Sequence, residues 1–132
     1  MSKYAEIETT IRSEKYLNEA LLLLGYKPEI HQEPQPLEGY LGDRRAELAH
    51  VIIRRQQIGG SSNDVGFRRQ PDGTYRAIVS EFDKRTHPEL LGLVSQRYAE
   101  VRTIAQAKNK GYKLASREQT ADGKIRLVFG VR

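Results

Sequence analysis

The stretch Leu21-Leu22-Leu23-Leu24-Gly25-Tyr26-Lys27 has a counterpart late in the chain, Ala107-Lys108-Asn109-Lys110-Gly111-Tyr112-Lys113. In both stretches an amphipathic helix meets a glycine, and Tyr-Lys then opens a segment with the pattern of a strand. Glycine adopts the left-handed backbone conformation that commonly ends a helix without steric cost. The repeat therefore predicts two helix-Gly-Tyr-Lys-strand units, each covering part of one sheet.

The residues before and after the first glycine predict a strand, a helix and an extended segment. Residues 3–11 alternate between apolar and polar side chains, as in a half-buried strand. Ser13 suits a helix N-cap. Apolar side chains then recur at helical spacing, at Leu17, Ala20, Leu21 and Leu24. The stretch that follows contains Pro28, Pro34 and Pro36, which lack backbone donors, and it predicts an edge strand or a surface connection.

The rest of the chain predicts a strand over residues 46–55 and a flexible loop over residues 57–63. A hairpin is predicted over residues 64–82, a second helix over about 88–110 and a closing hairpin over 112–131. Asp72-Gly73 and Asp122-Gly123 supply the tight turns of the two hairpins. Pro88 suits the first turn of the second helix, with Thr86 or His87 as its cap.

Clustered hairpins joined by tight turns favour an antiparallel sheet. We therefore predict a single α+β domain over residues 1–132, in which two helices pack on one face of the sheet. The outer face of that sheet is expected to remain free for water or a partner.

Composition limits the classes of function. The chain has 132 residues, which suits one domain, and 38% hydrophobic and 30% charged residues, which is ordinary for a globular protein. No apolar run approaches the roughly 18 residues of a membrane span, and a strand pattern starts at once, so we expect neither a membrane partner nor a signal peptide. Cysteine is absent, which excludes disulfides, thiol nucleophiles and cysteine-bound metal. We expect a cytoplasmic protein.

Charge is unevenly distributed along the chain. Residues 1–36 hold 4 basic and 6 acidic side chains, whereas residues 37–132 hold 18 and 11. A basic C-terminal part suits an anionic partner, such as nucleic acid or an acidic protein.

The closing hairpin gathers the basic residues most clearly. A two-residue turn at Asp122-Gly123 pairs Gln119 with Arg126 and Arg117 with Val128. Alternate residues of a strand point to opposite faces. One face then carries five cations, opposite the apolar Ile125, Leu127, Phe129 and Val131: these are Lys113, Arg117, Lys124, Arg126 and Arg132. This face is the predicted site for an anion or a partner, and a solvated sheet face is the alternative interpretation.

Other groups give weaker indications of chemistry. His31, His50 and His87 fit no metal-ligand spacing. We expect a hydrogen-bonded core or sheet-edge histidine at position 50, and a capping-region residue at a helix start at position 87. Glu6 and Glu8 share the solvent side of the first strand. The Gly-rich loop Gly59-Gly60-Ser61-Ser62 lacks the lysine and the helix of a phosphate-binding loop. The sequence predicts no cofactor, no metal and no catalytic residues.

Several segments together resemble one family. In chain order they are Glu38-Gly39-Tyr40-Leu41-Gly42, Ala49 to Arg54, Asp64-Val65-Gly66-Phe67, Gly73-Thr74-Tyr75, Gln96-Arg97-Tyr98-Ala99 and Asp122 to Leu127. The set resembles the small proteins encoded by the plastid hypothetical open reading frame thirty-five, also found in cyanobacteria, other bacteria and phages. Lys3 replaces a histidine usual in that family, and Ser80-Glu81-Phe82-Asp83 replaces a tryptophan-containing stretch.

The resemblance implies a domain of unknown function, with an accessory role beside an AAA-type ATPase and a location in the plastid stroma where the gene is plastid-encoded. Our leading hypothesis is a non-enzymatic binding or adaptor module that engages another protein through its outer sheet face or its Gly-rich loop. The alternative is a nucleic-acid-binding protein using Lys113, Arg117, Lys124 and Arg126. An enzyme, centred on Glu6 and Glu8 or on His50, is the third hypothesis.

Overall fold

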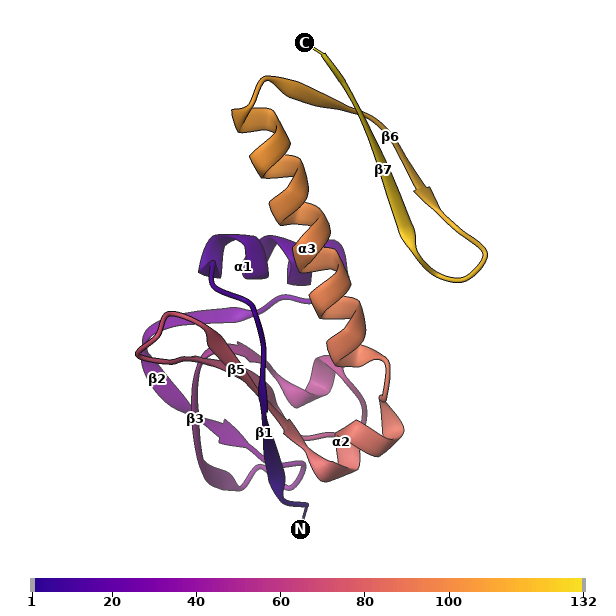
Figure 1. Ribbon diagram of the computed structural model, residues 1–132. Helices are drawn as coiled ribbons and strands as arrows, with labels where there is room; N and C mark the ends of the chain where they lie inside the picture. Colours follow the sequence, from indigo (N-terminus) through magenta and orange to yellow (C-terminus); the bar gives the residue numbers. More distant parts are fainter. Residues whose placement is uncertain (1, 132) are drawn as a thin grey trace.

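The computed structural model describes residues 2–131 (Figure 1). A short 3-10 turn, Arg55–Gln57, follows the third strand. The main elements, in chain order, are β1 (Tyr4–Glu8), α1 (Glu14–Leu23), β2 (Glu29–Glu38), β3 (Arg44–Ile53), β4 (Val65–Arg69), β5 (Tyr75–Ser80), α2 (Glu81–Thr86), α3 (Leu90–Asn109), β6 (Tyr112–Gln119) and β7 (Ile125–Val131).

The strands form two separate antiparallel sheets. Five strands lie in the order β1-β5-β4-β3-β2, and β6 pairs only with β7. The α+β class and the packing of helices on one face are confirmed, and the proline-containing β2 is an edge strand as predicted. The expectation that the closing hairpin joins the same sheet is wrong. Helix α3 has 20 residues and so spans about 30 Å, which carries the hairpin beyond the sheet (Figure 1).

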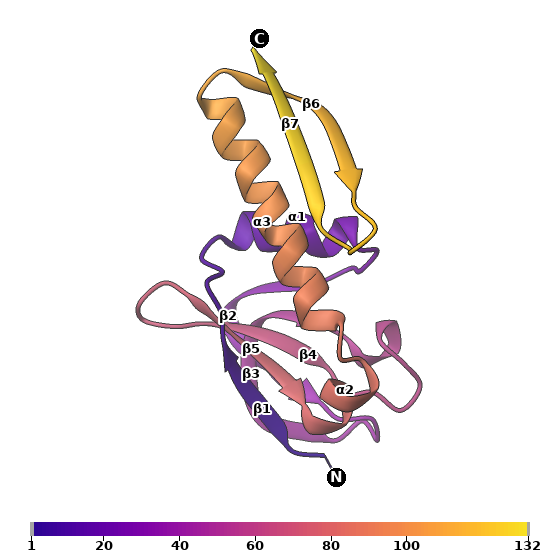
Figure 2. The same cartoon turned by 45° about the vertical axis from the view of Figure 1, so that its right-hand side comes forward.

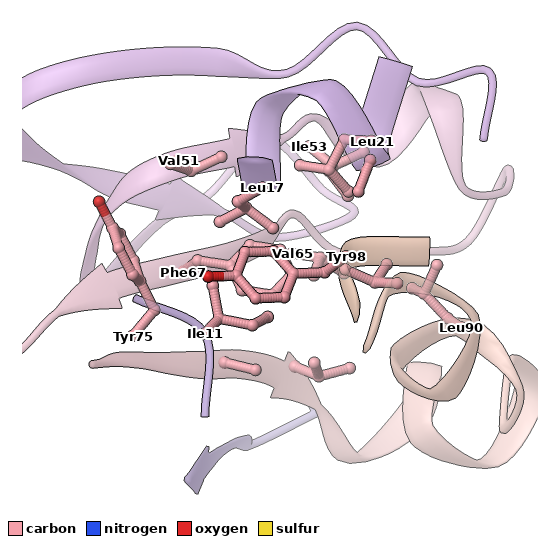
Figure 3. Close-up of a cluster of buried hydrophobic side chains, with 14 of the residues drawn as sticks. Ile11, Leu17, Leu21, Val51, Ile53, Val65, Phe67, Tyr75, Leu90 and Tyr98 are labelled. Atoms are coloured by element: carbon pink, nitrogen blue, oxygen red, sulfur yellow. The ribbon is translucent and has the colours of Figure 1, made fainter. Parts of the chain in front are cut away.

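The main core lies between one face of the five-stranded sheet and the two longer helices (Figure 3). The predicted stripe of α1 is buried at Leu17, Ala20 and Leu21. Helix α3 contributes Leu90, Val94, Tyr98 and Val101, and the sheet contributes Val51, Ile53, Val65, Phe67, Tyr75, Ala77 and Val79. The Tyr98 hydroxyl accepts hydrogen bonds at 3.0 Å from the backbone N–H groups of Arg12 and Ser13, which fixes the start of α1 against α3.

Both repeated units end their helices as predicted. The Ser13 hydroxyl caps α1 by accepting a hydrogen bond from the Tyr16 N–H at 3.1 Å. Gly25 and Gly111 have φ values of +94° and +86°, the left-handed conformation in which a side chain is strained. The strand that follows each glycine leaves in a new direction, β2 to the edge of the large sheet and β6 to the hairpin.

The other face of the large sheet is occupied by a second, smaller core. Leu37, Ala49, Ile52 and Ile78 are buried there, with Tyr4 packed against them. The sheet curls so that β1 and β3 meet across this face: the Arg45 guanidinium lies 5.0 Å from the centre of the Tyr4 ring and donates to the Ser2 carbonyl at 2.5 Å. The prediction of an outer face free for a partner is therefore wrong for this central region.

A third helix, α2, lies where the sequence predicts the end of a strand. The Ser80 hydroxyl accepts from the Asp83 N–H at 3.0 Å and caps α2. Helix α3 then starts at Leu90 with Glu89 as its N-cap, so Thr86 and His87 do not cap it and Pro88 lies before its first turn. The physical reason is that α2 uses residues 81–86 and leaves a short link to α3.

Candidate functional site

A cleft of about 690 Å³ lies beside the Gly-rich loop and is lined in part by α2. Figure 2 shows that α2 and the N-terminus lie at the same end of the molecule. Four segments that are far apart in sequence meet there: the residues before β1, the turn after β2, the loop before β4, and α2. The lining side chains are Ser2, Lys3, Tyr40, Ser61, Asn63, Glu81, Phe82 and Arg85.

Backbone hydrogen bonds hold the N-terminal segment in place as one wall of the cleft. The Glu81 N–H donates to the Lys3 carbonyl at 2.7 Å, and the Phe82 N–H donates to the Ser2 hydroxyl at 2.8 Å. These bonds satisfy two of the N–H groups that the first turn of α2 leaves without helical partners. Ser2 and Lys3 are thus joined with α2 into one surface.

Buried Asn63 lies at the floor of the cleft and belongs to a polar cluster built on Asp83, which is itself fully buried. One carboxylate oxygen of Asp83 accepts hydrogen bonds from the Ser80 hydroxyl at 2.6 Å, the Asn63 N–H at 2.9 Å and the Asn63 amide at 3.3 Å. The Asn63 side-chain oxygen accepts in turn from the Tyr40 N–H at 3.1 Å. The other Asp83 oxygen is buried and has no hydrogen-bond partner among the described residues. This cluster fixes Tyr40 and the loop relative to α2.

A second buried carboxylate, Asp64, anchors the base of the same loop. Its oxygens accept from the backbone N–H groups of Glu38 and Arg55, both at 2.8 Å, and from the Arg54 guanidinium at 2.7 Å. Arg54 also donates two hydrogen bonds to Glu29, at 2.7 and 2.8 Å. Those bonds lower the pKa of Glu29 to about 2. The loop that borders the cleft is therefore tied at both ends to the sheet.

The rim of the cleft combines aromatic rings with positive charge. Tyr40 is 43% exposed and Phe82 is half-buried. The side chains of Lys3 and Arg85 are exposed beside them, with one carboxylate, Glu81. Rings of this kind offer flat apolar contact area, and the two cations favour an anionic group on whatever enters.

The predicted basic face is only partly assembled, because the register of the closing hairpin differs by one residue from the prediction. Gln119 pairs with Ile125 and Arg117 with Leu127. The loop has three residues, closed by a hydrogen bond from the Thr120 N–H to the Lys124 carbonyl at 2.8 Å. A shift of one residue moves a side chain to the opposite face. Arg117 consequently faces α3, where it forms an ion pair with Glu100.

The other predicted cations have different surroundings. Lys113 pairs with Gly130 and Arg126 with Glu118, which places both on the face turned away from α3. Lys124 is 82% exposed at the end of the loop, 3.7 Å from Asp122. Arg132 lies outside the described residues. Ile125 and Leu127 are half-buried toward α3 while Arg126 stays exposed, as the alternation of this strand predicts.

The remaining candidate groups are held in structural contacts. Buried His50 accepts a hydrogen bond from the Arg69 N–H at 3.1 Å through Nδ1, which confirms a sheet histidine. His87 is the C-cap of α2 and does not lie at the start of the second long helix, where the sequence predicted it, and its Nε2 lies 3.4 Å from the Ser62 hydroxyl. Glu6 and Glu8 both pair with Arg76. Within residues 2–131, no cluster of three potential metal ligands occurs.

Sequence reasoning missed the cleft because its lining comes from residues 2 to 85. One local signal was present: Ser80-Glu81-Phe82-Asp83 has a capping hydroxyl followed three residues later by a carboxylate, which is typical of a helix start.

Comparison with known families gives one match. Residues 20–128 match the family described as "Protein of unknown function (DUF1257)". No curated protein and no solved structure matches the chain. None of the helices in the described part of the chain is both long enough and apolar enough to span a membrane.

Proposed function

We propose that this chain, which belongs to the DUF1257 family of unknown function, is a non-enzymatic module that binds a segment of another protein in the cleft beside its Gly-rich loop. The observation that carries the proposal is the combination of accessible aromatic and cationic side chains at the rim with a hydrogen-bonded floor. A rim of this kind supplies contact area and charge, and the fixed floor holds it in one shape.

The residue types at the rim favour a protein partner. Tyrosine, phenylalanine and arginine are enriched at protein interfaces, and tyrosine and arginine are frequent among the residues that dominate the binding energy. The aromatic rings bury a large area with few rotatable bonds, and the arginine guanidinium offers several hydrogen-bond donors. Tyr40, Phe82 and Arg85 provide all three types within one cleft. We expect an apolar side chain of the partner to contact the two rings, and an acidic side chain to meet Lys3 and Arg85.

The Ser2 and Asn63 side chains of the cleft are engaged in structural hydrogen bonds, which supports binding over catalysis. A nucleophile needs a general base within hydrogen-bond reach. The Ser2 hydroxyl accepts from the backbone of α2, and the Asn63 side chain is bound to Ser80, Asp83 and Tyr40. These groups hold the walls and floor of the cleft together.

Photo-crosslinking in the native host tests the proposal. A photoreactive phenylalanine analogue in place of Tyr40 is expected to crosslink to one partner protein, and the crosslink is expected to disappear when Arg85→Glu is added. The same analogue in place of Leu23, which is 55% exposed on α1, is the matched control and should not capture that protein. A crosslink at Tyr40 that is unchanged by Arg85→Glu contradicts the proposal.

We further propose that the chain belongs with the plastid open-reading-frame-thirty-five proteins it resembles, that it acts in the cytoplasm or the plastid stroma, and that its partner is an AAA-type ATPase. The support is the ordered set of matching segments, which includes Tyr40 at the cleft and Asp64 beneath the loop. Identification of the crosslinked protein by mass spectrometry tests the partner: any other protein there removes the ATPase from the proposal and leaves the cleft as the binding site.

A further inference from the structure

Residues 102–131 form a basic lobe that projects from the end of the molecule opposite to the cleft (Figures 1 and 2). It consists of the last eight residues of α3 and the β6–β7 hairpin. Every described residue of the two strands is exposed or only half-buried. The hairpin contacts α3 through one face, where the half-buried apolar side chains are Leu114, Ile125, Leu127 and Phe129. The other face and the strand edges are open.

A sheet of two strands leaves one edge of each strand unpaired. In antiparallel pairs the backbone groups of alternate residues point toward the partner strand and away from it. Thr120 and Lys124 are joined by a backbone hydrogen bond, so their backbone groups point toward each other. Two residues further along each strand, the backbone groups of Glu118 and Arg126 also point toward the partner strand. The N–H and C=O groups of Ile125, Leu127 and Phe129 therefore point to the free edge of β7.

The β7 edge is the better template for a further strand. β6 carries a bulge between Leu114 and Ser116, and a bulge disrupts the regular spacing that another strand needs. Every residue of β7 from Ile125 to Val131 has a partner on β6, because the extra residue of the bulge lies on β6, and β7 is extended throughout. Val128, on the face of β7 turned away from α3, is 36% exposed, and Val131, at the end of the strand, is 86% exposed.

The lobe carries a strong positive charge. Between residues 102 and 131 the sequence has seven basic and two acidic side chains, a net charge of +5. Of the two acidic side chains, Glu118 lies 3.9 Å from Arg126 and Asp122 lies 3.7 Å from Lys124. These pairs are exposed, and exposed ion pairs contribute little and exchange readily. Charge complementarity selects an acidic partner.

We infer that the β7 edge binds an extended, acidic segment of a partner protein, which adds to the hairpin as a third strand. Strand addition supplies both donors and acceptors to the edge, whereas a phosphate backbone accepts hydrogen bonds and leaves the carbonyl groups of Ile125, Leu127 and Phe129 unpaired. Arg117 is also engaged with Glu100 on the helix side and does not join an outward phosphate-binding face. A third strand widens a sheet that has only two strands, which is a marginal structure on its own.

This surface is separate from the cleft, so it gives the chain a second binding site. The N-terminus and α2 lie at one end of the molecule and the hairpin at the other in both views (Figures 1 and 2). A chain with a protein-binding surface at each end of α3 holds two partners apart by a fixed distance, which is what an adaptor requires.

Binding of defined probes to the whole chain tests the inference. The first probe is a fluorescein-labelled peptide of ten residues in which valine and glutamate alternate. The second is the same peptide with lysine in place of each glutamate, and the third is a twenty-nucleotide single-stranded RNA. We expect the acidic peptide to bind, the basic peptide to fail, and Lys124→Glu/Arg126→Glu to weaken binding of the acidic peptide by about tenfold or more. Lys15→Glu/Lys27→Glu makes the same charge change at exposed positions outside the lobe and should change binding far less.

Amide hydrogen exchange separates strand addition from simple charge attraction. With the acidic peptide bound, the amides of Ile125, Leu127 and Phe129 are expected to exchange more slowly, since their N–H groups gain acceptors. Peptide binding without this protection overturns strand addition. Tighter binding of the RNA than of the acidic peptide overturns the protein partner in favour of nucleic acid. Substitutions at the cleft, such as Arg85→Glu, should leave all of these results unchanged, so the test is independent of the proposed function.

Discussion

The guanidinium of Arg117 on β6 donates hydrogen bonds to both carboxylate oxygens of Glu100 on α3, one of them at 3.2 Å, and so joins the hairpin to the helix. The Glu100 side chain is only 6% exposed, and Arg97 lies 3.4 Å from the same carboxylate. Burial makes this carboxylate dependent on its cationic partners. Contact with Glu100 also raises the pKa of Arg117, which stays charged.

Arg117→Ala is expected to loosen the hairpin without unfolding the large sheet, because Glu100 loses its closer cation. Amide exchange in β6 and β7 should become several-fold faster, while exchange in β3, β4 and β5 stays at the wild-type rate. Arg126→Ala is the matched control, since it removes an arginine from the exposed face of the same hairpin. Equal effects of the two substitutions would show that the Glu100 contact does not fix the hairpin.

Arg54→Ala is expected to destabilise the protein by about 3–5 kcal/mol, because it leaves the carboxylate of Asp64 buried without its charged partner. The Asp64 side chain is 1% exposed and lies 2.7 Å from Arg54. Urea denaturation measures the change. Arg76→Ala is the comparison: Arg76 also pairs with two carboxylates, Glu6 and Glu8, but these are exposed, so its urea midpoint should change little.

Stability is expected to fall as the pH is lowered below about 6.5, the ordinary pKa of histidine, because His50 resists protonation in the folded state. Burial lowers the pKa of His50 below its ordinary value of 6.5, and the positive charges of Arg69 and Arg68 lower it further. A lowered pKa in the folded state means that the stabilisation is complete above pH 6.5 and is lost as the pH falls, because the unfolded chain takes up the proton first. His50→Asn keeps an acceptor near the Arg69 N–H and does not titrate. Its urea midpoint should be nearly independent of pH in this range.

A second acidic transition is expected from Glu29. The hydrogen bonds from Arg54 lower the pKa of Glu29 from its ordinary value of 4.5 to about 2. The stabilisation that comes from the lowered pKa of Glu29 is complete above pH 4.5 and is lost as the pH falls from 4.5 toward 2. Glu29→Gln should flatten the stability profile below pH 4.5 and leave the His50 transition in place. A profile identical to wild type would mean that the pair of Glu29 and Arg54 does not form in solution.

Gly66→Ala is expected to destabilise the protein by about 1–3 kcal/mol or more through overpacking. A Cβ at this position would lie 2.5 Å from the Ala49 Cβ and 3.0 Å from a Leu37 methyl, inside the second core. Gly92→Ala is the matched control in an exposed turn of α3, where the added methyl would meet no atom within 4 Å beyond the local helix backbone and the adjacent residues, and it should stabilise the protein by up to about 1 kcal/mol. Thermal melts compare the two. A tolerated alanine at position 66 would show that Ala49 and Leu37 do not pack closely against the Gly66 backbone.

The local features of this fold were predictable because each depends on neighbours in sequence. The stripe of Leu17, Ala20 and Leu21 needs only helical spacing, and the turns at Gly25 and Gly111 need only the conformational freedom of glycine. The edge position of β2 likewise follows from its prolines, which cannot donate hydrogen bonds on both sides.

The predictions that were wrong concern features that depend on a single hydrogen bond or on contacts between residues far apart in sequence. The loop at Asp122-Gly123 closes one residue earlier than a two-residue turn, at Thr120, and this moved Arg117 to the other face. The sequence also gave no indication that Tyr4 and Arg45 meet across the sheet and cover its outer face. For the same reason the cleft, which needs Tyr40, Phe82 and Arg85 together, was not predicted.

The large core takes nothing from the chain beyond Val101, although α3 continues to Asn109. Folding of the sheet and its two covering helices therefore places little demand on the last thirty residues. We expect related chains to diverge most in length and sequence there, and grafting a foreign hairpin onto α3 to change what that end recognises while the remainder still folds.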